Sequence, residues 1–164
     1  MVDDIDRLLA KTATKGSWHG GGSAAALCMA LAAALLEKLA QSPRLIAELG
    51  VIRRRGVSLV DRDAETFARV IYALHRRNRR SSRRALMTAT EIPRQVFRDA
   101  HRILVLSRAV RRTISPRYRV DLNCAVAIAK AAGTSARALI MTNLAWLADP
   151  AYSRRLRREL TQLT

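Results

Sequence analysis

Hydrophobic residues recur at helical spacing along almost the whole length of this 164-residue chain. Apolar positions that repeat about every 3.6 residues are typical of helices with one buried face. The repeats predict helices over residues 3–11, 23–41, 58–77, 83–112, 121–133, 135–147 and 152–162. We find no internal repeat and no domain boundary. We therefore expect residues 1–164 to form a single all-α domain, an up-and-down bundle of about six to seven helices.

Serine, proline and glycine indicate where several of these helices begin and end. Ser23 is a good N-cap for the alanine-rich helix that follows a loop over residues 12–22. Because its small side chains let neighbouring backbones approach closely, we expect this helix at the centre of the bundle. Pro93 lies inside the fourth segment and predicts a kink or a break there. Six arginines within residues 75–84 predict an exposed turn.

The composition favours a helical protein of the cytoplasm. Apolar residues make up 49% of the chain and aromatic residues only 4%, whereas strands favour β-branched and aromatic residues. The longest apolar run, residues 24–36, is shorter than the roughly 20 residues that cross a bilayer. Cys28 and Cys124 lie in apolar helical patterns, as free thiols in a reducing compartment do. The acidic first residues do not resemble a secretion signal.

The charge of the chain is strongly positive. Thirty lysines and arginines against 13 acidic residues give a net charge of +17, and residues 51–120 contain 19 arginines and no lysine. Such a surface attracts polyanions, among them nucleic acid, anionic lipid and substrates with several carboxylates. The aromatic residues are scattered, and none is interleaved with the arginines to stack on bases. Charge alone therefore leaves open both a nucleic-acid binder and a solvated arginine-rich surface.

A run of glycines opens directly onto the alanine-rich helix. Gly20, Gly21 and Gly22 precede Ser23, and glycine is favoured where the backbone must pass close to another group. A helix N-terminus also presents unpaired N–H groups that suit a carboxylate, a phosphate or a polarised carbonyl. The run is a candidate binding loop, and the alternative is a flexible loop that ends in an ordinary cap.

Helical geometry turns one of two neighbouring carboxylates toward the bundle. Asp63 shares a stripe with Phe67, Val70 and Leu74, whereas Asp61 points to roughly the opposite side. Burial raises the pKa of a carboxyl group, and a carboxyl group with a perturbed pKa is a candidate general acid or base. Asp63 is therefore our candidate catalytic residue, and the alternative is an aspartate that binds the N–H groups of a helix N-terminus.

Three further polar residues are candidates for the same site. Asp121 shares a stripe with apolar residues and can also serve as an N-cap. Asn143 lies on an apolar face and needs hydrogen-bond partners, from the bundle or from a ligand. His19, beside the glycine run, is expected to be the most exposed of the three histidines. It can assist proton transfer near pH 7, and the alternative is an ordinary solvated loop residue. These residues outline a pocket with two acids, an amide and backbone donors, which suits a polar small molecule. No two histidines have the spacing of metal ligands, so we expect no metal.

Several separated motifs, in this order, resemble the formiminotransferase-cyclodeaminase carboxy-terminal domain and its stand-alone relatives. These relatives include methenyltetrahydrofolate cyclohydrolases of the serine-cycle type. The motifs are GGGSAAA at residues 20–26, LVDRDAETF at 59–67, IP at 92–93, VDLNCA at 120–125 and TNL at 142–144. The resemblance extends over nearly the whole chain.

The resemblance implies an all-helical subunit that forms a homodimer, with a folate site at or near the dimer interface. The implied chemistry acts on the one-carbon unit at N5 and N10 of tetrahydrofolate. It either closes 5-formiminotetrahydrofolate with loss of ammonia or hydrates the 5,10-methenyl form to the 10-formyl form. By matched position Asp63 is the acid–base group, Asp121 is its partner or a pterin contact, and the backbone of residues 20–23 lines the ligand. The resemblance implies no cofactor beyond the tetrahydrofolate substrate.

Three positions depart from the family pattern. His19 stands where the family has proline, His75-Arg76 stands where it has proline-lysine, and Leu139 replaces an asparagine. Two other interpretations follow. In the first, the chain is a relative that acts on a non-folate substrate, by opening or closing a ring or by eliminating a group. In the second, it is a basic helical protein that binds nucleic acid. In a folate enzyme the arginines at 76, 77, 79 and 80 would attract the substrate's glutamate tail.

Overall fold

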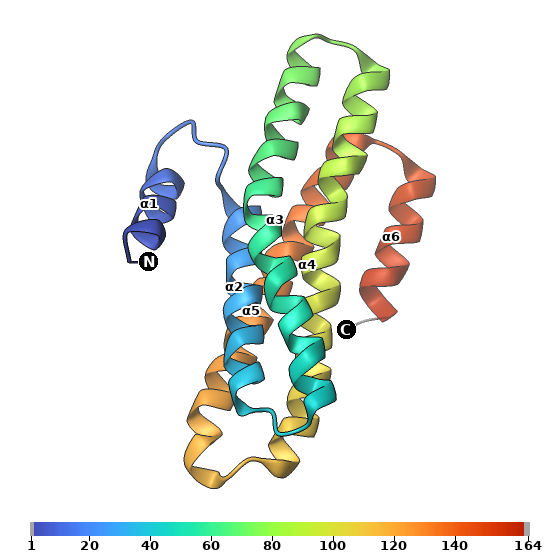
Figure 1. Ribbon diagram of the computed structural model, residues 1–164. Coiled ribbons are helices and arrows are strands. Elements are labelled where there is room, and N and C mark those ends of the chain that lie inside the picture. Colours follow the sequence, from blue (N-terminus) through green and yellow to red (C-terminus); the bar gives the residue numbers. More distant parts are fainter. Residues whose placement is uncertain (1, 163–164) are drawn as a thin grey trace.

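The computed structural model describes residues 2–162, which form six α-helices and one short 3-10 helix, with no strand in that range (Figure 1). The elements are α1 (Val2–Ala13), α2 (Gly21–Leu39), α3 (Pro43–His75), α4 (Arg79–Thr113), η1 (Pro116–Tyr118), α5 (Arg119–Leu147) and α6 (Pro150–Gln162). The predictions of an all-α fold and of about six to seven helices are confirmed.

Helices α2 to α5 run alternately up and down and form the bundle (Figure 1). Helix α2 packs against α3, α4 and α5, as expected for the central helix. The α3–α4 hairpin extends beyond α2, because its helices of 33 and 35 residues are about 50 Å long and α2 has only 19 residues. Helix α1 lies to one side of the bundle, and α6 lies along α4 (Figure 1).

Small residues bring α2 and α3 close together. Ala26, Ala32 and Ala33 of α2 are fully buried. On the facing side of α3, a Cβ added at Gly56 would lie 2.8 Å from the Cβ of Ala30, closer than real Cβ atoms approach. The glycine at 56 therefore permits this approach of the two backbones, which also brings the N-terminal part of α2 beside the second half of α3.

Two predicted helix starts were wrong, because capping residues extend the helices. Helix α3 begins at Pro43 and not near residue 58, since proline is favoured in the first turn of a helix. Helix α4 begins at Arg79, where the side chain of Asn78 accepts a hydrogen bond from the backbone N–H of Ser81. The predicted exposed turn over residues 75–84 is thus confined to residues 76–78.

Two predicted interruptions do not end their helices. Helix α4 continues through Pro93. Helix α5 continues through Gly133, where two helices had been predicted. A Cβ added at Gly133 would lie 3.6 Å from the Cβ of Ala100, so this glycine lies against α4. Packing between α4 and α5 therefore overrides the weak helix propensity of glycine, a difference of about 1 kcal/mol from alanine.

Two segments, residues 21–39 and 116–147, are long and apolar enough to cross a membrane by length and composition alone. In the most apolar stretch of the first, 56% of the residues are buried, as expected for the core helix α2. In the second, which includes α5, only 28% are buried. Helix α5 therefore leaves much of its apolar surface uncovered within one chain.

Candidate active site

A cavity of about 280 Å³ lies at the N-terminal end of α2. Residues from the loop before α2 and from α2, α3, α4 and α5 line it: Ser17, Trp18, Gly20, Gly21, Gly22, Asp63, Thr66, Phe67, Ala89, Pro93, Leu139, Thr142, Asn143 and Trp146. Among these described residues Asp63 alone has an ionisable side chain. A ligand in this cavity would therefore meet mostly apolar walls, one carboxyl group and a few neutral polar groups.

Asp63 projects from α3 onto the first turn of α2. A Cβ added at Gly22 would overlap both carboxylate oxygens of Asp63, so the carboxylate lies directly against the backbone of the glycine run. Ser23 Oγ donates a hydrogen bond to Asp63 Oδ2 at 3.1 Å. Asp61, by contrast, is exposed over 79% of its side chain. The prediction that Asp63 faces inward and Asp61 outward is confirmed.

Burial dominates the electrostatics of Asp63. Loss of solvent raises the pKa of its carboxyl group above the ordinary value for aspartate. Hydrogen bonds from the hydroxyl and backbone of Ser23, and the charge of His19, act in the opposite direction but only in part. The carboxyl group is thus more readily protonated than an exposed one, which suits a group that must both accept and donate a proton.

Ser23 lies behind Asp63 and does not line the cavity. Its side chain is buried, inside α2 and not at its N-cap, which is Gly20. Its hydroxyl oxygen is 2.9 Å from the carbonyl oxygen of Val60 and 3.1 Å from Asp63 Oδ2. Because the hydroxyl has one hydrogen, it can donate fully to only one of these acceptors at a time. The prediction that Ser23 is the N-cap is wrong, and its side chain instead holds the carboxylate. A contact between the Ser23 backbone and a ligand stays a prediction.

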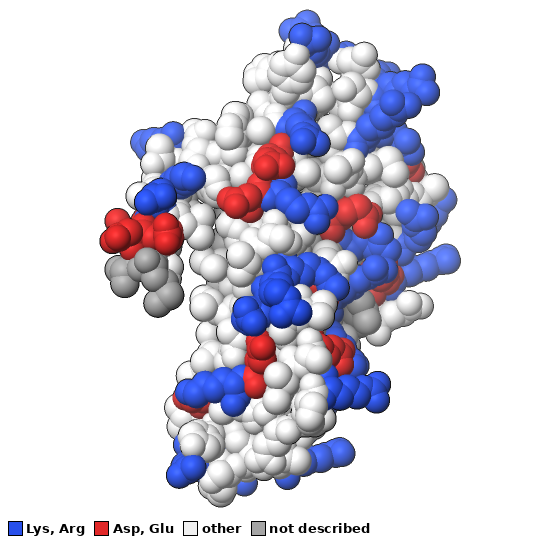
Figure 2. Space-filling view, in the orientation of Figure 1, with Lys and Arg blue, Asp and Glu red and all other residues white. Residues whose placement is uncertain are grey.

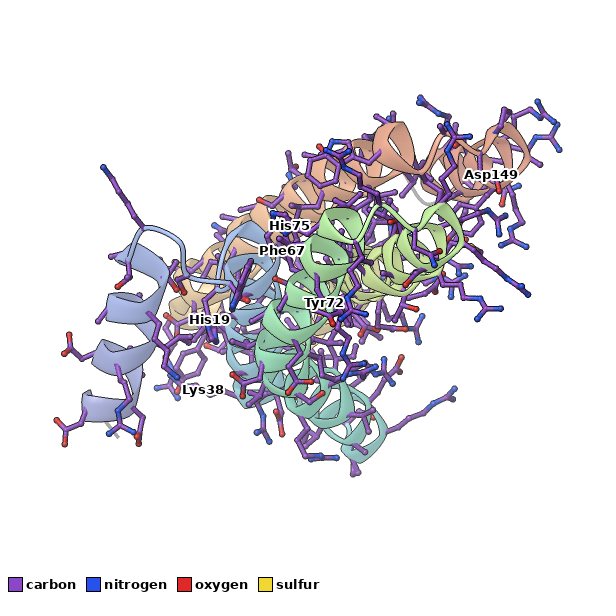
Figure 3. The ribbon with its side chains drawn as sticks, turned by 90° about the horizontal axis from the view of Figure 1, so that it is seen from above. His19, Lys38, Phe67, Tyr72, His75 and Asp149 are labelled. Carbon is purple, nitrogen blue, oxygen red and sulfur yellow. The ribbon has the colours of Figure 1, made fainter. Side chains whose placement is uncertain are left out.

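His19 lies outside the cavity. Only 16% of its side chain is exposed, and its Nε2 is 3.5 Å from Asp61 Oδ1. Seen from above, it lies on the side of the bundle that faces α1, and His75 lies on α3 (Figure 3). His75 is exposed, so the prediction that His19 is the most exposed histidine was wrong. The loop turns the ring away from the cavity toward the start of the LVDRDAETF motif.

Asp121 lies at the opposite end of the bundle. It is in the first turn of α5, where its Oδ2 is 3.4 Å from Nζ of Lys38, near the end of α2. Gly22 and Lys38 are 16 residues apart on α2, or about 24 Å along the helix. Within one chain the expected pocket with two acids is therefore wrong. The N-cap of α5 is Tyr118, so Asp121 does not have that role either.

Asn143, on α5, lines the same cavity as Asp63. Its amide makes no hydrogen bond within the described part of the chain, which leaves the amide free for a ligand. Leu139, one turn earlier on α5, also lines the cavity, and a Cβ added at Gly21 would lie 3.7 Å from its Cδ2. The cavity thus joins the glycine run, Asp63 and Asn143, as predicted from their helical positions.

Three aromatic residues at the cavity were not predicted as part of the site. Trp18, Phe67 and Trp146 are 45%, 38% and 51% exposed. The rings of Trp18 and Phe67 meet edge to face, with centroids 6.1 Å apart. Helical spacing could have indicated two of them, because Phe67 follows Asp63 by four residues and Trp146 follows Asn143 by three. Exposed rings around a cavity suit a planar heterocyclic ligand.

In the part of the chain that the structure describes, no group of three or more histidine, cysteine, aspartate or glutamate side chains could hold a metal ion.

Comparison with known proteins identifies one family and several solved structures of similar fold. The model of the formiminotransferase-cyclodeaminase family matches residues 4–162. The crystal structure of formiminotetrahydrofolate cyclodeaminase from Thermotoga maritima has the same fold, with a TM-score of 0.86 at 19% sequence identity. The match covers 93% of this chain and 83% of that one. No curated protein sequence matches the chain significantly.

Proposed function

Because the chain belongs to the formiminotransferase-cyclodeaminase family, we propose that its cavity binds a tetrahydrofolate and acts on the one-carbon unit carried by N5 and N10. One observation carries the proposal. The carboxylate of Asp63 is the single ionisable group among the described residues of the cavity wall, on a protein with a net charge of +17. A cationic amidinium carbon would therefore meet an anion there and no arginine or lysine.

In a cyclodeaminase reaction Asp63 would move one proton between two nitrogens. N10 attacks the formimino carbon, and Asp63 accepts the proton that N10 loses. The bond from that carbon to the formimino nitrogen then breaks, and this nitrogen leaves as ammonia with the proton from Asp63 and one from solvent. The product is the cationic 5,10-methenyl form, which the ionised carboxylate stabilises.

In a cyclohydrolase reaction the same group would act on water. Water attacks the amidinium carbon, and Asp63 accepts a proton from it. Asp63 returns a proton to N5 as the bond between N5 and the carbon breaks, and the second proton of the water goes to solvent. The product is the neutral 10-formyl form. Both reactions need one carboxyl group that exchanges protons readily, which the raised pKa of Asp63 supports.

The remaining walls would hold the pterin ring. Trp146 and Phe67 supply aromatic surface for a planar ring, and the amide of Asn143 can both donate and accept a hydrogen bond. The backbone of Gly20–Gly22 allows close approach, since no side chain intervenes. In this proposal Asp63 is the catalytic residue, and Asn143 and the glycine run bind the substrate.

We also propose that the protein forms a homodimer through α2 and α5, which are adjacent in the bundle. Each of these helices has a stripe of exposed or half-exposed uncharged residues. The stripe on α2 ends at the charged residue Lys38. The stripes contain Ala24, Leu27, Cys28, Leu31, Ala34 and Leu35 on α2, and Val120, Cys124, Ala127, Ala131 and Ala138 on α5. Leu31 is 50% exposed and Val120 is 70% exposed. A second copy is the favoured occupant, because two chains of charge +17 repel each other least where neither presents arginine.

Leu139 supports a second candidate function on a non-folate substrate. This apolar side chain lies in the cavity wall at the position where the family has asparagine, so one polar contact is replaced by an apolar one. A relative that closes or opens a ring on a less polar amidine or imine would keep Asp63 and lose that contact. A thermal-shift screen with folates and related heterocycles discriminates the two, since a ligand that binds the folded protein raises its melting temperature, and a tighter ligand raises it more at the same concentration.

The direct test is the absorbance of the 5,10-methenyl form. We expect the wild-type protein to consume this band as a cyclohydrolase, or to produce it from 5-formiminotetrahydrofolate. Asp63→Asn should lower kcat by about 10²-fold to 10⁴-fold, the usual contribution of a positioned acid–base group, and remain folded by circular dichroism. No activity in the wild type would contradict the folate proposal, and equal activity in both proteins would remove Asp63 from the mechanism.

A further inference from the structure

The outer face of α6 carries arginines that have no acidic partner. Tyr152, Leu156 and Leu160 are buried on its inner face, against the bundle. The exposed face carries Arg154, Arg155, Arg157 and Arg158. Arg155 lies over the ring of Tyr152, with its Cζ 5.2 Å from the ring centroid. The other three make no ion pair within the described part of the chain, so their charges are uncompensated.

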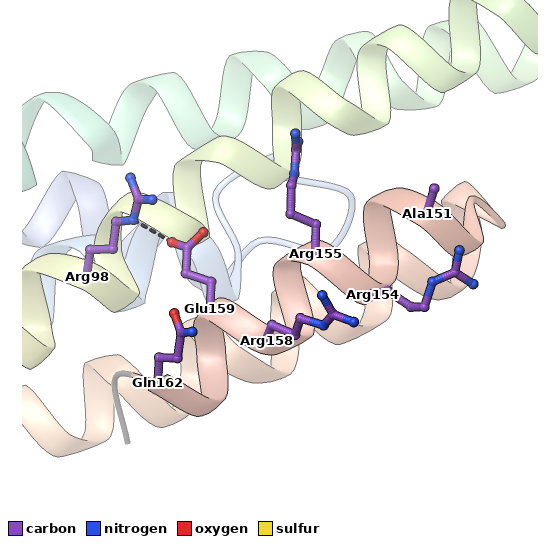
Figure 4. A pocket seen from close by; sticks show the side chains of 7 residues that line it. All are labelled: Arg98, Ala151, Arg154, Arg155, Arg158, Glu159 and Gln162. Carbon is purple, nitrogen blue, oxygen red and sulfur yellow. Dashed lines mark hydrogen bonds and ion pairs between the residues drawn. The ribbon is translucent and has the colours of Figure 1, made fainter.

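The groove between α6 and α4 concentrates this charge. It has a volume of about 520 Å³, and its lining includes Arg98, Arg154, Arg155 and Arg158 (Figure 4). Glu159 is the acidic residue among the described groove residues. Burial tends to raise its pKa, but hydrogen bonds from Arg94 and Arg98 outweigh burial and hold the pKa of this carboxyl group below its ordinary value. Because the guanidinium groups of Arg94 and Arg98 already bind Glu159, this carboxylate does not neutralise the α6 arginines, which remain free for an external anion.

This surface is separate from the cavity that contains Asp63. No residue lines both the groove and that cavity. Figure 2 shows lysine and arginine side chains gathered along the edge of the molecule that α4 and α6 form in Figure 1. A ligand of this edge therefore need not be the substrate of the enzyme.

We propose that α6 and the adjacent part of α4 bind the phosphate backbone of a nucleic acid. Guanidinium groups bind phosphate oxygens in a two-pronged geometry, and the backbone positions of Arg154 and Arg158 lie about one turn, or about 6 Å, apart along one face of α6. Several cations in a row suit an anion with repeated charges better than a single small anion. Among the described residues of α6, no aromatic ring projects from this face for stacking on bases. Binding therefore follows the backbone and is largely independent of sequence.

The same face is poorly suited to a membrane. An interfacial helix buries apolar side chains below the lipid headgroups, in addition to its basic residues. The apolar residues Tyr152, Leu156 and Leu160 are instead buried against the bundle. The exposed positions of α6 other than its arginines are Pro150, Ala151, Thr161 and Gln162. Nucleic acid is therefore the polyanion that this surface fits.

The test is fluorescence anisotropy with a labelled single-stranded RNA of mixed sequence, and with single-stranded and duplex DNA as parallel arms. The triple variant Arg154→Gln, Arg157→Gln and Arg158→Gln removes three charges from α6. Its matched control replaces Arg54, Arg69 and Arg112, which are exposed and unpaired within the described residues of α3 and α4, by glutamine. Both variants lose the same net charge.

We expect the α6 variant to bind RNA roughly tenfold or more weakly than the wild type, with the control within about twofold. The slope of log K against log salt should become less steep by about 2 for single strands, which corresponds to three lost phosphate contacts. Equal losses in the two variants would overturn the proposal, because they would show attraction by net charge alone. Absence of nucleic-acid binding, with or without binding to vesicles of anionic lipid, would overturn it as well. The folate reaction should be unchanged in both variants, which separates this test from that of the proposed function.

Discussion

The carboxylate of Asp63 occupies the space into which a side chain at residue 22 would project. Of the three glycines in the run, Gly22 is the one for which the structure gives a steric reason. A Cβ at Gly20 would meet nothing within 4 Å, and one at Gly21 would make only an ordinary contact with Leu139. Close approach of the Asp63 carboxylate, and not flexibility of a loop, thus explains the glycine at position 22.

This relationship predicts that Gly22→Ala separates activity from stability. The added Cβ must displace the Asp63 carboxylate, so we expect kcat to fall by about tenfold or more. Alanine is a better helix former than glycine by up to about 1 kcal/mol. Because this gain opposes the cost of displacing the carboxylate, the melting temperature should change little. Gly21→Ala is the matched control, with kcat close to that of the wild type. A fully active Gly22→Ala protein would show that the position of this carboxylate is not required.

The pH dependence of activity should depend on Ser23. Its hydroxyl group stabilises the ionised form of Asp63, so removing it in Ser23→Ala raises the pKa of that carboxyl group further. Because the reaction needs the ionised form first, activity is lost as the pH falls through this pKa. The acid limb of kcat/KM should therefore move to higher pH in Ser23→Ala.

Thr66→Ala is the control for this shift. The hydroxyl group of Thr66, which also lines the cavity, donates to the backbone oxygens of Arg62 and Asp63 and not to the carboxylate. The acid limb of kcat/KM for Thr66→Ala should therefore coincide with that of the wild type. An unchanged or lowered limb in Ser23→Ala would contradict the assignment of Asp63 as the group that titrates.

Substitution in the apolar stripe of α2 tests the proposed dimer. Leu31→Arg places a charge in the middle of the stripe, and we expect the protein to sediment as a monomer at concentrations where the wild type is a dimer. Ile5→Arg is the control, since Ile5 on α1 is similarly exposed at 56% against 50% for Leu31. A monomeric wild type, or a Leu31→Arg protein that still dimerises, would refute an interface on this stripe.

Binding of a folate's glutamate tail should depend on Arg77, in the α3–α4 turn, and on Arg79, at the start of α4. Arg77 and Arg79 line a hollow of about 590 Å³ whose wall also includes Trp146, a residue of the Asp63 cavity. Replacing both by glutamine should raise KM severalfold more for a polyglutamylated substrate than for the monoglutamyl form, with kcat unchanged. Equal KM changes for the two substrates would show that the tail does not reach this hollow.

Among the four arginines first considered for the tail, the structure distinguishes two pairs. Arg76 lies over the ring of Tyr72, with its Cζ 4.7 Å from the centroid. Neither Arg76 nor Arg80 lines the hollow. Arg76→Gln with Arg80→Gln is therefore a control of equal charge for the tail experiment.

The sequence by itself determined the helical class, the central place of α2 and the direction in which Asp63 faces. These features depend on spacing within one helix, where the position of each side chain follows from a rotation of 100° per residue. The same local logic failed where packing or capping outweighs propensity. Gly133 does not end α5, because this glycine packs against Ala100 of α4. Helix α4 starts earlier than the arginine content suggested, because Asn78 caps it.

Only the tertiary structure decided which of the candidate residues share a site. Asp63 and Asn143 line one cavity because α3 and α5 both pass the N-terminal end of α2, whereas Asp121 is separated from them by most of the length of that helix. His19 turns away toward Asp61, and Ser23 is buried behind the carboxylate. Helical periodicity specifies the face on which a residue lies, but the distance between two residues on different helices depends on the direction and overlap of those helices. Those are set by packing between segments far apart in the chain.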